Sequence, residues 1–296
     1  MTPAQTISRR MDASRVTARG RGPTSACTFA LVSVAQARGD RVQRGVRLLE
    51  FPGTMKVTAF AVAAALAALA FAGEAAPKAA GGLLDRIDHL VYATPDLAVG
   101  IDAAERLFGV RASQGGQHPG EGTRNALIAL GPTSYFEIIG PDPEQPKPKR
   151  PRRFGIDDLK APRLTTWVAK GTDLEKLVKD AAAHGVKLGA VIPGSRKRPD
   201  GVVLSWRYTD PRVILGDRMV PYFIDWGASP HPSASAARGV TLLSLRAEHP
   251  DAGRVQGMLR QLGLDLVVGR GPNPALIATF DSPRGQVELR TPNPEP

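Results

Sequence analysis

The sequence predicts an α+β fold assembled from repeated βαβββ units, and three observations predict it. Residues 86–97 align with residues 163–174, with Arg, Val, Asp and Leu at matching positions. Each of these segments leads into a helical pattern that ends at a Gly-Val pair. A third segment, from Thr241, repeats the same order of elements. Internal similarity of this kind is typical of a fold built by duplicating one supersecondary unit.

The first unit is predicted over 86–140. It opens with an apolar run that stops at a turn-forming Thr-Pro-Asp, and such a run is typical of a strand. Apolar residues at helical spacing follow, and the pattern ends at Gly109, which predicts a helix and its stop. A loop rich in glycine, 115–125, leads to the last strands. The expected elements are strand 87–93, helix 97–108, and strands 125–130 and 134–139.

The second unit is predicted over 163–227 and the third over 238–296, with a polar connector at 144–153 and another at 228–238. The second unit has strand candidates at 202–208 and 222–226. In the third unit we expect strand 241–247, helix 255–262, and strands 266–268, 275–280 and 286–290. The three tryptophans fall on predicted strands, so core packing is their expected role.

Charge is unevenly distributed along the chain, whose formal net charge is +11. Residues 1–54 hold nine Arg and no Lys against three acidic residues. The remainder is only weakly basic, so the composition does not support a nucleic-acid-binding core. The basic run Arg196-Lys197-Arg198 is expected to be solvated surface.

Residues 55–72 are predicted to be a signal peptide, because Met55-Lys56 precedes an uncharged apolar run that ends in small residues. Residues 1–54 are then a spurious or disordered extension, and 73–85 a linker. The protein is expected to be periplasmic or secreted, with no stable membrane anchor. An Ala-rich helix and a transit peptide are the alternatives. The single cysteine, Cys27, lies in the extension, so thiol chemistry is not expected.

Four segments resemble the glyoxalase-like branch of the vicinal oxygen chelate superfamily. They are Ile87-Asp88-His89-Leu90-Val91, the segment 115–125 with its run Gly-Gly-Gln-His-Pro-Gly-Glu-Gly-Thr-Arg-Asn, Tyr135-Phe136-Glu137-Ile138, and Arg198-Pro199-Asp200-Gly201 followed by Trp206-Arg207 and 221–226. The resemblance covers roughly 86–232. It implies that two modules pair edge to edge into a half-open barrel of the glyoxalase and dihydroxybiphenyl dioxygenase type. The third unit would then add a further βαβββ-like module.

The resemblance also implies a divalent metal held by the first and last strand of each module. His89 and Glu137 occupy these places in the first module, and both suit Zn, Fe, Mn or Ni. In the second module Thr166 takes the first place, with Ile224 or Asp225 at the last. The metal set is therefore incomplete, and His118, His231 or Asp225 could complete it. The alternative is a hydrogen-bonding His89 and a Glu137 paired to an arginine. That arginine would be Arg124 or Arg207.

Residues Arg124, Asn125, Arg207 and Asp225 are the candidates for ligand binding. Arginine beside an aromatic residue, as in Trp206-Arg207, can grip an anion. No sequence fingerprint of a nucleotide cofactor is present. In the third unit Ser244 and Glu288 match His89 and Glu137, so a second metal site is not expected there. That unit is expected to pack beside the first two or to support a homodimer.

Two hypotheses on function follow. In the first, the protein is a metal-dependent lyase, isomerase or dioxygenase that acts on a small oxygenated substrate. In the second, it is a metal-free protein that binds or sequesters a small anionic molecule in the same cleft. A purely structural role has the weakest support. Fold alone does not identify the substrate.

Overall fold

The computed structural model describes residues 82–291. The predicted extension and signal peptide lie outside the described residues, as does most of the predicted linker. At the end of that linker, Leu83–Arg86 form the short helix α2. Within 82–291 no helix is both long enough and apolar enough to cross a membrane.

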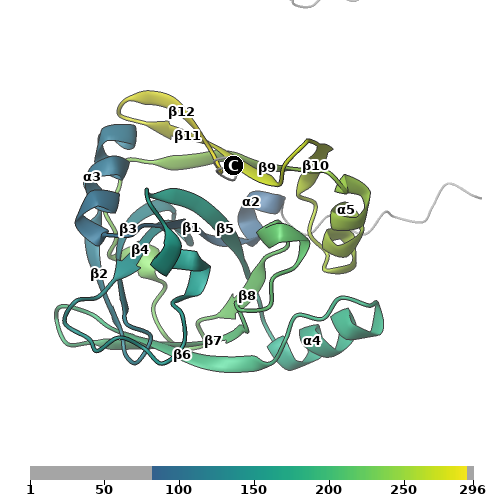
Figure 1. Ribbon diagram of the computed structural model, residues 1–296, viewed down its shortest axis with the longest axis horizontal. Helices are drawn as coiled ribbons and strands as arrows, with labels where there is room; N and C mark the ends of the chain where they lie inside the picture. Colours follow the sequence, from purple (N-terminus) through teal and green to yellow (C-terminus); the bar gives the residue numbers. More distant parts are fainter. Residues whose placement is uncertain (1–81, 292–296) are drawn as a thin grey trace, which may run out of the picture. The chain divides into compact units, whose positions relative to one another are not determined.

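Eight strands close into a barrel in the order β1-β4-β3-β2-β6-β7-β8-β5 (Figure 1). Each half has the same internal order, because β1 and β5 pair in parallel with the last strand of their own unit. This arrangement confirms the predicted α+β fold with its curled sheet. The strands are β1 Ile87–Ala93, β2 Ser113–His118, β3 Thr123–Gly131, β4 Ser134–Pro141, β5 Arg163–Lys170, β6 Val191–Lys197, β7 Val203–Thr209 and β8 Tyr222–Asp225.

The barrel is closed where the sequence predicts a half-open one, and the difference lies at the junction of β2 and β6. We call this junction the seam. β1 and β5 pair along most of their length, but the seam has a single ladder pair, Gln117 with Lys197. A Cβ atom on Gly116 would lie 2.1 Å from the Lys197 carbonyl oxygen, so glycine is what allows the two backbones to meet. The segment predicted as a glycine-rich loop is therefore mainly strand, with a turn at 119–122.

An aspartate begins the helix of each unit. The side chains of Asp96, Asp173 and Asp251 each accept a hydrogen bond from the backbone N–H three residues further along. This N-cap contact satisfies a donor that the first turn of a helix leaves free. It gives a physical reason for the aspartate that recurs between the aligned segments. The helices are α3 Leu97–Phe108, α4 Leu174–Ala183 and α5 Ala252–Gln261.

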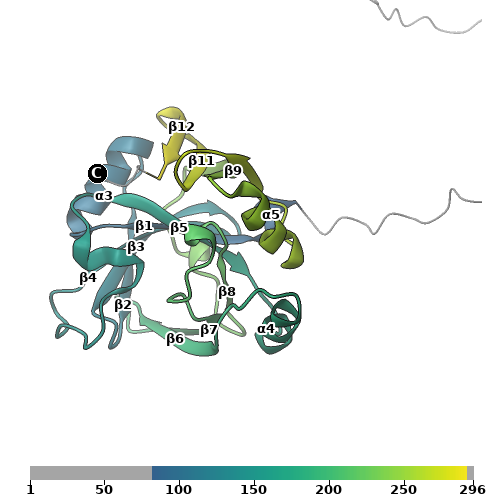
Figure 2. The ribbon, with the colours of Figure 1, turned by 45° about the vertical axis from the view of Figure 1, so that its right-hand side comes forward.

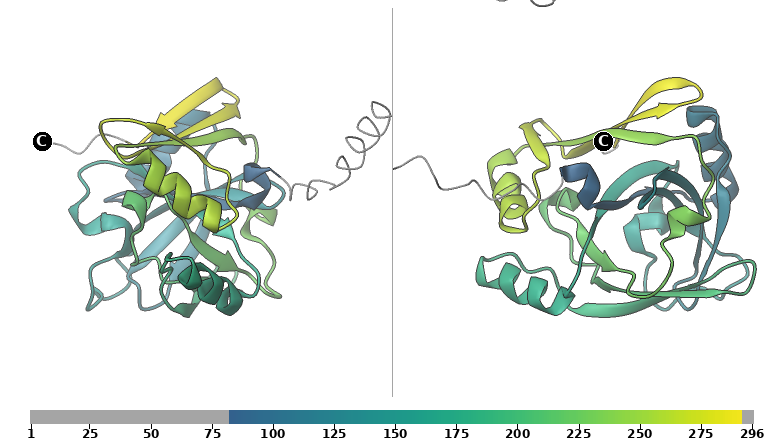
Figure 3. Two further views of the ribbon diagram at one scale, coloured as in Figure 1. Left: turned by 90° about the vertical axis from the view of Figure 1, so that its right-hand side faces the viewer. Right: turned by 180° about the vertical axis from the view of Figure 1, so that it is seen from behind.

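The third unit has the same element order but a different sheet order. Its strands are β9 Thr241–His249, β10 Val267–Arg270, β11 Ala275–Ser282 and β12 Gly285–Arg290. They form a separate sheet in the order β10-β9-β11-β12, so the first strand lies between the second and third strands of its unit. Figures 2 and 3 show this sheet along one side of the barrel.

One face of the third sheet packs on the barrel through aromatic contacts. The ring centroid of Phe280 lies 4.9 Å from that of Phe108 and 5.9 Å from that of Phe136. The opposite face carries ion pairs, among them Arg246 with Glu288 at 3.2 Å. Ser244, which matches His89 in the sequence, is exposed on this sheet. The unit thus packs beside the first two, and its role in a homodimer stays a prediction.

Candidate functional site

A β-bulge in β1 brings two adjacent polar residues together. The register between β1 and β5 shifts between Ile87 and His89. Asp88 is the extra residue of this bulge, so its side chain does not follow the regular alternation of side chains between the two faces of a strand. Both Asp88 and His89 are buried. His89 Nδ1 lies 2.7 Å from Asp88 Oδ1. Because a carboxylate can only accept, Nδ1 carries the hydrogen of this contact.

Asp88 accepts hydrogen bonds from three aromatic N–H groups. Besides His89, Trp226 Nε1 donates to Asp88 Oδ2 at 3.0 Å, and His231 Nε2 lies 3.3 Å from the same oxygen. Burial by itself raises the pKa of the Asp88 carboxyl. The hydrogen bonds from His231 and His89 outweigh burial and lower this pKa from 3.8 to about 2. Asp88 therefore stays ionised and fixes the orientation of all three rings.

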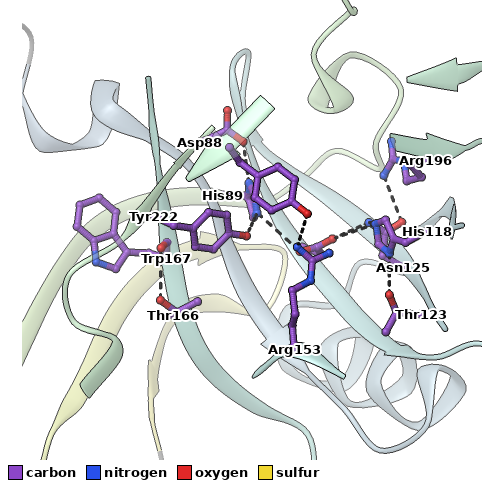
Figure 4. A network of polar contacts seen from close by, with 12 residues as sticks. Asp88, His89, His118, Thr123, Asn125, Arg153, Thr166, Trp167, Arg196 and Tyr222 are labelled. Atoms are coloured by element: carbon purple, nitrogen blue, oxygen red, sulfur yellow. Dashed lines mark hydrogen bonds and ion pairs between the residues drawn. The ribbon is translucent and has the colours of Figure 1, made fainter. Parts of the chain in front are cut away.

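The Nε2 side of His89 faces a cavity inside the barrel. Nε2 lies 3.7 Å from Glu137 Oε2 on β4 and 3.4 Å from the Tyr222 hydroxyl on β8. The ring of Tyr135 stacks on His89, with centroids 4.6 Å apart. Burial raises the pKa of the Tyr222 hydroxyl well above 10. Tyr222 is therefore a neutral phenol that donates its hydrogen bond toward His89 (Figure 4).

A second chain of contacts crosses the cavity from the seam to Glu137. Arg196 Nη1 donates to Asn125 Oδ1 at 3.2 Å, and Asn125 Nδ2 donates to Glu137 Oε1 at 2.7 Å. This direction is fixed because arginine only donates and a carboxylate only accepts. The second hydrogen on Asn125 Nδ2 faces His118 Nε2 at 3.4 Å. Asn125 thus links the two halves of the barrel.

His118 is held as a neutral ring beside this chain. Burial lowers the pKa of His118 well below 6.5, and the nearby guanidinium groups of Arg153 and Arg196 lower it further. Nδ1 lies 3.0 Å from the Thr123 hydroxyl. With Nδ1–H directed to Thr123, the Nε2 lone pair is left to accept from Asn125. The ring therefore positions Asn125.

Arg196 corrects the expectation that the basic run at 196–198 is solvated surface. Its exposed fraction is 2%. Side chains alternate across a strand, so Arg196 turns into the barrel while Lys197 turns outward. A carboxylate within 4 Å would neutralise the guanidinium, but none is found among residues 82–291. Its Nε atom is buried and has no hydrogen-bond partner.

The connector between the first two units contributes two side chains to the same cavity. Arg153 and Phe154 both line it, although the sequence predicted only a polar linker here. Arg153 Nη1 donates to the Tyr208 hydroxyl at 3.2 Å, and its guanidinium carbon lies 5.4 Å from the centre of that ring. Phe154 adopts a left-handed backbone conformation with φ of 64°. The free volume that remains is about 30 Å³, room for one or two water molecules.

The predicted site residues fall into three groups. His89, His118, Asn125 and Glu137 come together in the cavity. His231 contacts Asp88 behind His89. The remaining three lie outside the cavity lining: Arg124, Arg207 and Asp225.

Arg207 is exposed and forms an ion pair with Glu175 of α4. Asp225 accepts from the Gly227 N–H at 2.9 Å. The structure therefore offers no support for an anion grip by Arg207 over the cavity. Two of the three tryptophans also depart from a simple core role. Trp167 is fully buried, but Trp206 and Trp226 line the cavity.

The register of the second unit corrects the expected counterpart of Glu137. Val91 pairs with Glu137 between β1 and β4, and Val168 pairs with Tyr222 between β5 and β8. Val91 lies two residues after His89, and Val168 lies two residues after Thr166, which matches His89. Tyr222 therefore occupies the position in the second unit that Glu137 occupies in the first. The sequence predicted Ile224 or Asp225 there. One half of the barrel thus supplies an imidazole and a carboxylate, and the other a hydroxyl and a phenol.

The comparisons with known proteins agree with this architecture. The family model described as glyoxalase-like domain matches residues 87–263. The chain belongs to this glyoxalase-like family. This establishes the resemblance seen in the sequence. No curated protein matches the chain.

Three solved structures illustrate how distant the similar folds are. A hypothetical protein from Staphylococcus aureus is 14% identical, covers 69% of this chain and 84% of its own, and has a TM-score of 0.46. Methylmalonyl-CoA epimerase from Mycobacterium tuberculosis is 18% identical over 50% of this chain and 92% of its own, with a TM-score of 0.33. A fusion of a xylose isomerase-like TIM barrel with 4-hydroxyphenylpyruvate dioxygenase is 16% identical over 73% and 33%, with a TM-score of 0.31. None of these likenesses assigns a substrate.

The donor set of this glyoxalase-like barrel does not fit a divalent metal. Within residues 82–291, no three His, Cys, Asp or Glu side chains are arranged to hold one. Glu137 and His118 face each other at 4.0 Å, but the Asn125 amide already donates to both. Two guanidinium groups line the same cavity and would repel a dication. His231, the other expected ligand, is turned to Asp88.

The predicted set lacked several site residues, among them Asp88, Tyr135, Arg153, Arg196 and Tyr222. Two of them had a usable signal. Asp88 directly precedes His89, and a histidine on a strand commonly has a carboxylate partner. Arg196 lies in a strand whose alternate residues must face inward. The position of Arg153 could not be found in this way, since nothing in a polar connector indicates that it enters a barrel.

Proposed function

We propose that this glyoxalase-like protein binds a small anionic, oxygenated molecule inside the barrel and that His89 exchanges a proton with it. The observation that carries the proposal is Arg196. A guanidinium remains charged even where burial lowers its pKa. A buried charge without a carboxylate in direct contact is costly, and Glu137 is linked to Arg196 only through the Asn125 amide. A carboxylate or another oxyanion bound beside Arg196 would supply that counter-charge.

The size of the cavity supports a small ligand. About 30 Å³ is free beside Arg153 and Phe154 as they stand, which is room for only one or two water molecules. A larger ligand requires the connector to move these two side chains. The backbone of Phe154 is in a left-handed conformation, which is unfavourable for a residue with a Cβ. A movement of the connector that releases this conformation would recover part of its own energetic cost.

The chemistry around His89 supports proton transfer rather than binding alone. Asp88 holds Nδ1–H and would stabilise the imidazolium that forms when Nε2 takes a proton. The proton would come from a carbon next to a carboxylate or carbonyl. The electron pair left behind would move onto oxygen as an enolate, facing the Tyr222 hydroxyl and Arg196. Return of the proton to the same or a neighbouring carbon completes an isomerisation, with atoms and electrons balanced.

Thermal unfolding in the presence of glyoxylate, pyruvate and malonate tests this proposal. We expect at least one of them to raise the Tm of the wild-type protein. Arg196→Met should remove that increase, because the positive charge that would hold the anion is gone. Arg207→Gln, which also removes one arginine charge, serves as the matched control and should keep the increase.

Two outcomes would contradict the proposal. The first is an equal ligand-induced shift in Arg196→Met and the wild type. The second is a shift that disappears after dialysis against a chelator and returns with Zn²⁺, which would support the metal-dependent hypothesis instead. For the proton-transfer step, exchange of substrate C–H for deuterium should be lost in His89→Gln while ligand binding remains.

We also propose that the protein is exported, on the basis of its sequence at 55–72. N-terminal sequencing of protein recovered from the periplasm or medium tests this, with Gly73 as the expected first residue. Recovery of only a cytoplasmic chain that begins at Met1 would reject it.

A further inference from the structure

A groove of about 500 Å³ lies on the outer face of the barrel, at the seam and beside the start of α3. His118, Asn125 and Arg196 face the interior, so their neighbours on β2, β3 and β6 face outward. The outward residues used below are Gln117, Arg124 and Lys197, and all three line the groove. The sheet lies between the groove and the barrel cavity, and Asn125 lines both.

Two cations stand in one row across this groove. Arg124 is paired in register with Gln117, and Gln117 is paired with Lys197. Neighbouring strands lie about 4.8 Å apart, so about 10 Å separates the backbones of the two cationic residues. Two long side chains can close this distance on one anion. The row joins the two barrel halves, because β3 belongs to the first unit and β6 to the second.

Neither charge of the row is neutralised within the part of the chain that the structure describes. Arg124 and Lys197 have no carboxylate within 4 Å there, and the Arg124 Nε atom is buried without a hydrogen-bond partner. Two further cations line the groove and are already paired: Arg198 with Asp200 at 2.7 Å, and Arg111 with Asp102 at 3.0 Å and with Glu105. The one acid at the groove, Glu144, accepts from Gln117 Nε2 at 2.8 Å. A buried N–H group without a partner is costly.

Two apolar side chains of α3 also line the groove. They are Leu97, which is buried in the core, and Ile101, which is partly buried. An anion bound to the cationic row would thus have an apolar surface beside it. This combination suits a molecule with a charged head and a short hydrocarbon stem.

We propose that this groove binds a phosphate group on a short apolar stem, held between Arg124 and Lys197 across the seam. Phosphate offers the several oxygens that two separate cations require, and arginine matches its geometry. The site is distinct from the barrel cavity, so it does not depend on the function proposed above.

Calorimetric titration of the full chain with phenyl phosphate, at fixed ionic strength, tests the proposal, with inorganic phosphate as the second probe. We expect saturable binding of one phenyl phosphate per chain, tighter than inorganic phosphate because of the stem. Arg124→Gln should weaken binding about tenfold, since it removes charge-assisted hydrogen bonds. Glu144→Gln should strengthen it about threefold, because a nearby negative charge is removed.

Lys179→Gln, at an exposed position on α4, is the charge-matched control and should bind as the wild type does. Equal weakening in Lys179→Gln and Arg124→Gln would overturn the proposal, because it would show attraction to net charge only. Absence of saturable binding would also overturn it. So would loss of binding in Arg196→Met with no effect of Arg124→Gln, because the probe would then lie inside the barrel.

Discussion

The two halves of the barrel have the same strand order and different chemistry. The half formed by β1–β4 supplies the Asp88–His89 pair, Glu137, and the amide of Asn125. The half formed by β5–β8 supplies a guanidinium, Arg196, and aromatic side chains such as Tyr222. Duplication has therefore kept the backbone and not the site. The function proposed above assigns proton transfer to the first half and anion binding to the second.

The difference teaches that equivalent strand positions do not imply equivalent ligands. Thr166 and Tyr222 occupy the positions in the second half that match His89 and Glu137 in the first. Thr166 donates to the Arg218 carbonyl oxygen at 3.0 Å, and Tyr222 remains a phenol. His89, Glu137 and Tyr222 therefore line the cavity, and Thr166 does not, so the site is asymmetric. The following variants test how much of this asymmetry depends on single side chains.

The largest expected effect comes from making the two halves chemically alike. Thr166→His combined with Tyr222→Glu would place two imidazoles and two carboxylates at the four equivalent positions, which are suitable ligands for Zn²⁺. We expect Zn²⁺ affinity to increase about a thousandfold, or about 4 kcal/mol. Calorimetric titration measures it. A folded double variant that binds Zn²⁺ as weakly as the parent would show that backbone geometry, and not residue type, separates the halves.

Asp88→Asn tests the proton-transfer half. We expect it to lower the free energy of unfolding by about 3 kcal/mol near neutral pH, because three buried N–H groups lose their charged acceptor. The folded-state pKa of Asp88 is about 2, below its usual 3.8. Its stabilisation is therefore complete above about pH 4 and disappears as the pH falls toward 2, a change of about 2 kcal/mol.

Urea denaturation of both proteins between pH 6 and pH 2 measures this effect. The difference in stability between wild type and Asp88→Asn should shrink as the pH falls. A difference that stays constant over this range would mean that the Asp88 carboxylate is not the source of the stabilisation.

Gly115→Ala tests the contact that joins the halves. A Cβ at this position would lie 2.1 Å from Asn125 Oδ1 and 2.8 Å from Arg196 Nη1. We expect a loss of about 2 kcal/mol, because the two side chains must move apart in a packed interior. Gly253→Ala in α5, where nothing lies within 4 Å, is the matched control and should stabilise the helix by up to about 1 kcal/mol. Equal stability of the two variants would refute the close contact at the seam.

The smallest effect is expected on the outside of the anion-holding half. Arg207→Gln removes an exposed ion pair with Glu175, and exposed ion pairs contribute little to stability. We expect the smallest fall in the free energy of unfolding among these variants. The effect should vanish at high salt, because solvent ions screen exposed charges. A loss that persists in high salt would assign Arg207 a larger role than its exposure suggests.

The sequence was sufficient for the parts of the fold that depend on local pattern. The strand 87–93 and the helix 97–108 have the boundaries that their apolar spacing and terminal glycine predict. The candidates His89 and Glu137 came from the family resemblance and Asn125 from the glycine-rich segment, and all three line the cavity. By contrast, Arg196 was predicted to lie on the surface, because three consecutive basic residues are usually exposed to solvent.

What the sequence by itself determined is the duplicated α+β architecture, because periodicity and capping residues act over a few neighbouring positions. Tertiary structure decided which side chains meet. A one-residue bulge turned Asp88 toward His89, the pairing of β5 with β8 placed Tyr222 opposite Glu137, and the connector brought Arg153 into the barrel. Each of these depends on register between segments far apart in the chain. Shifting a strand by one residue exchanges its inward and outward faces, so local pattern cannot specify the site.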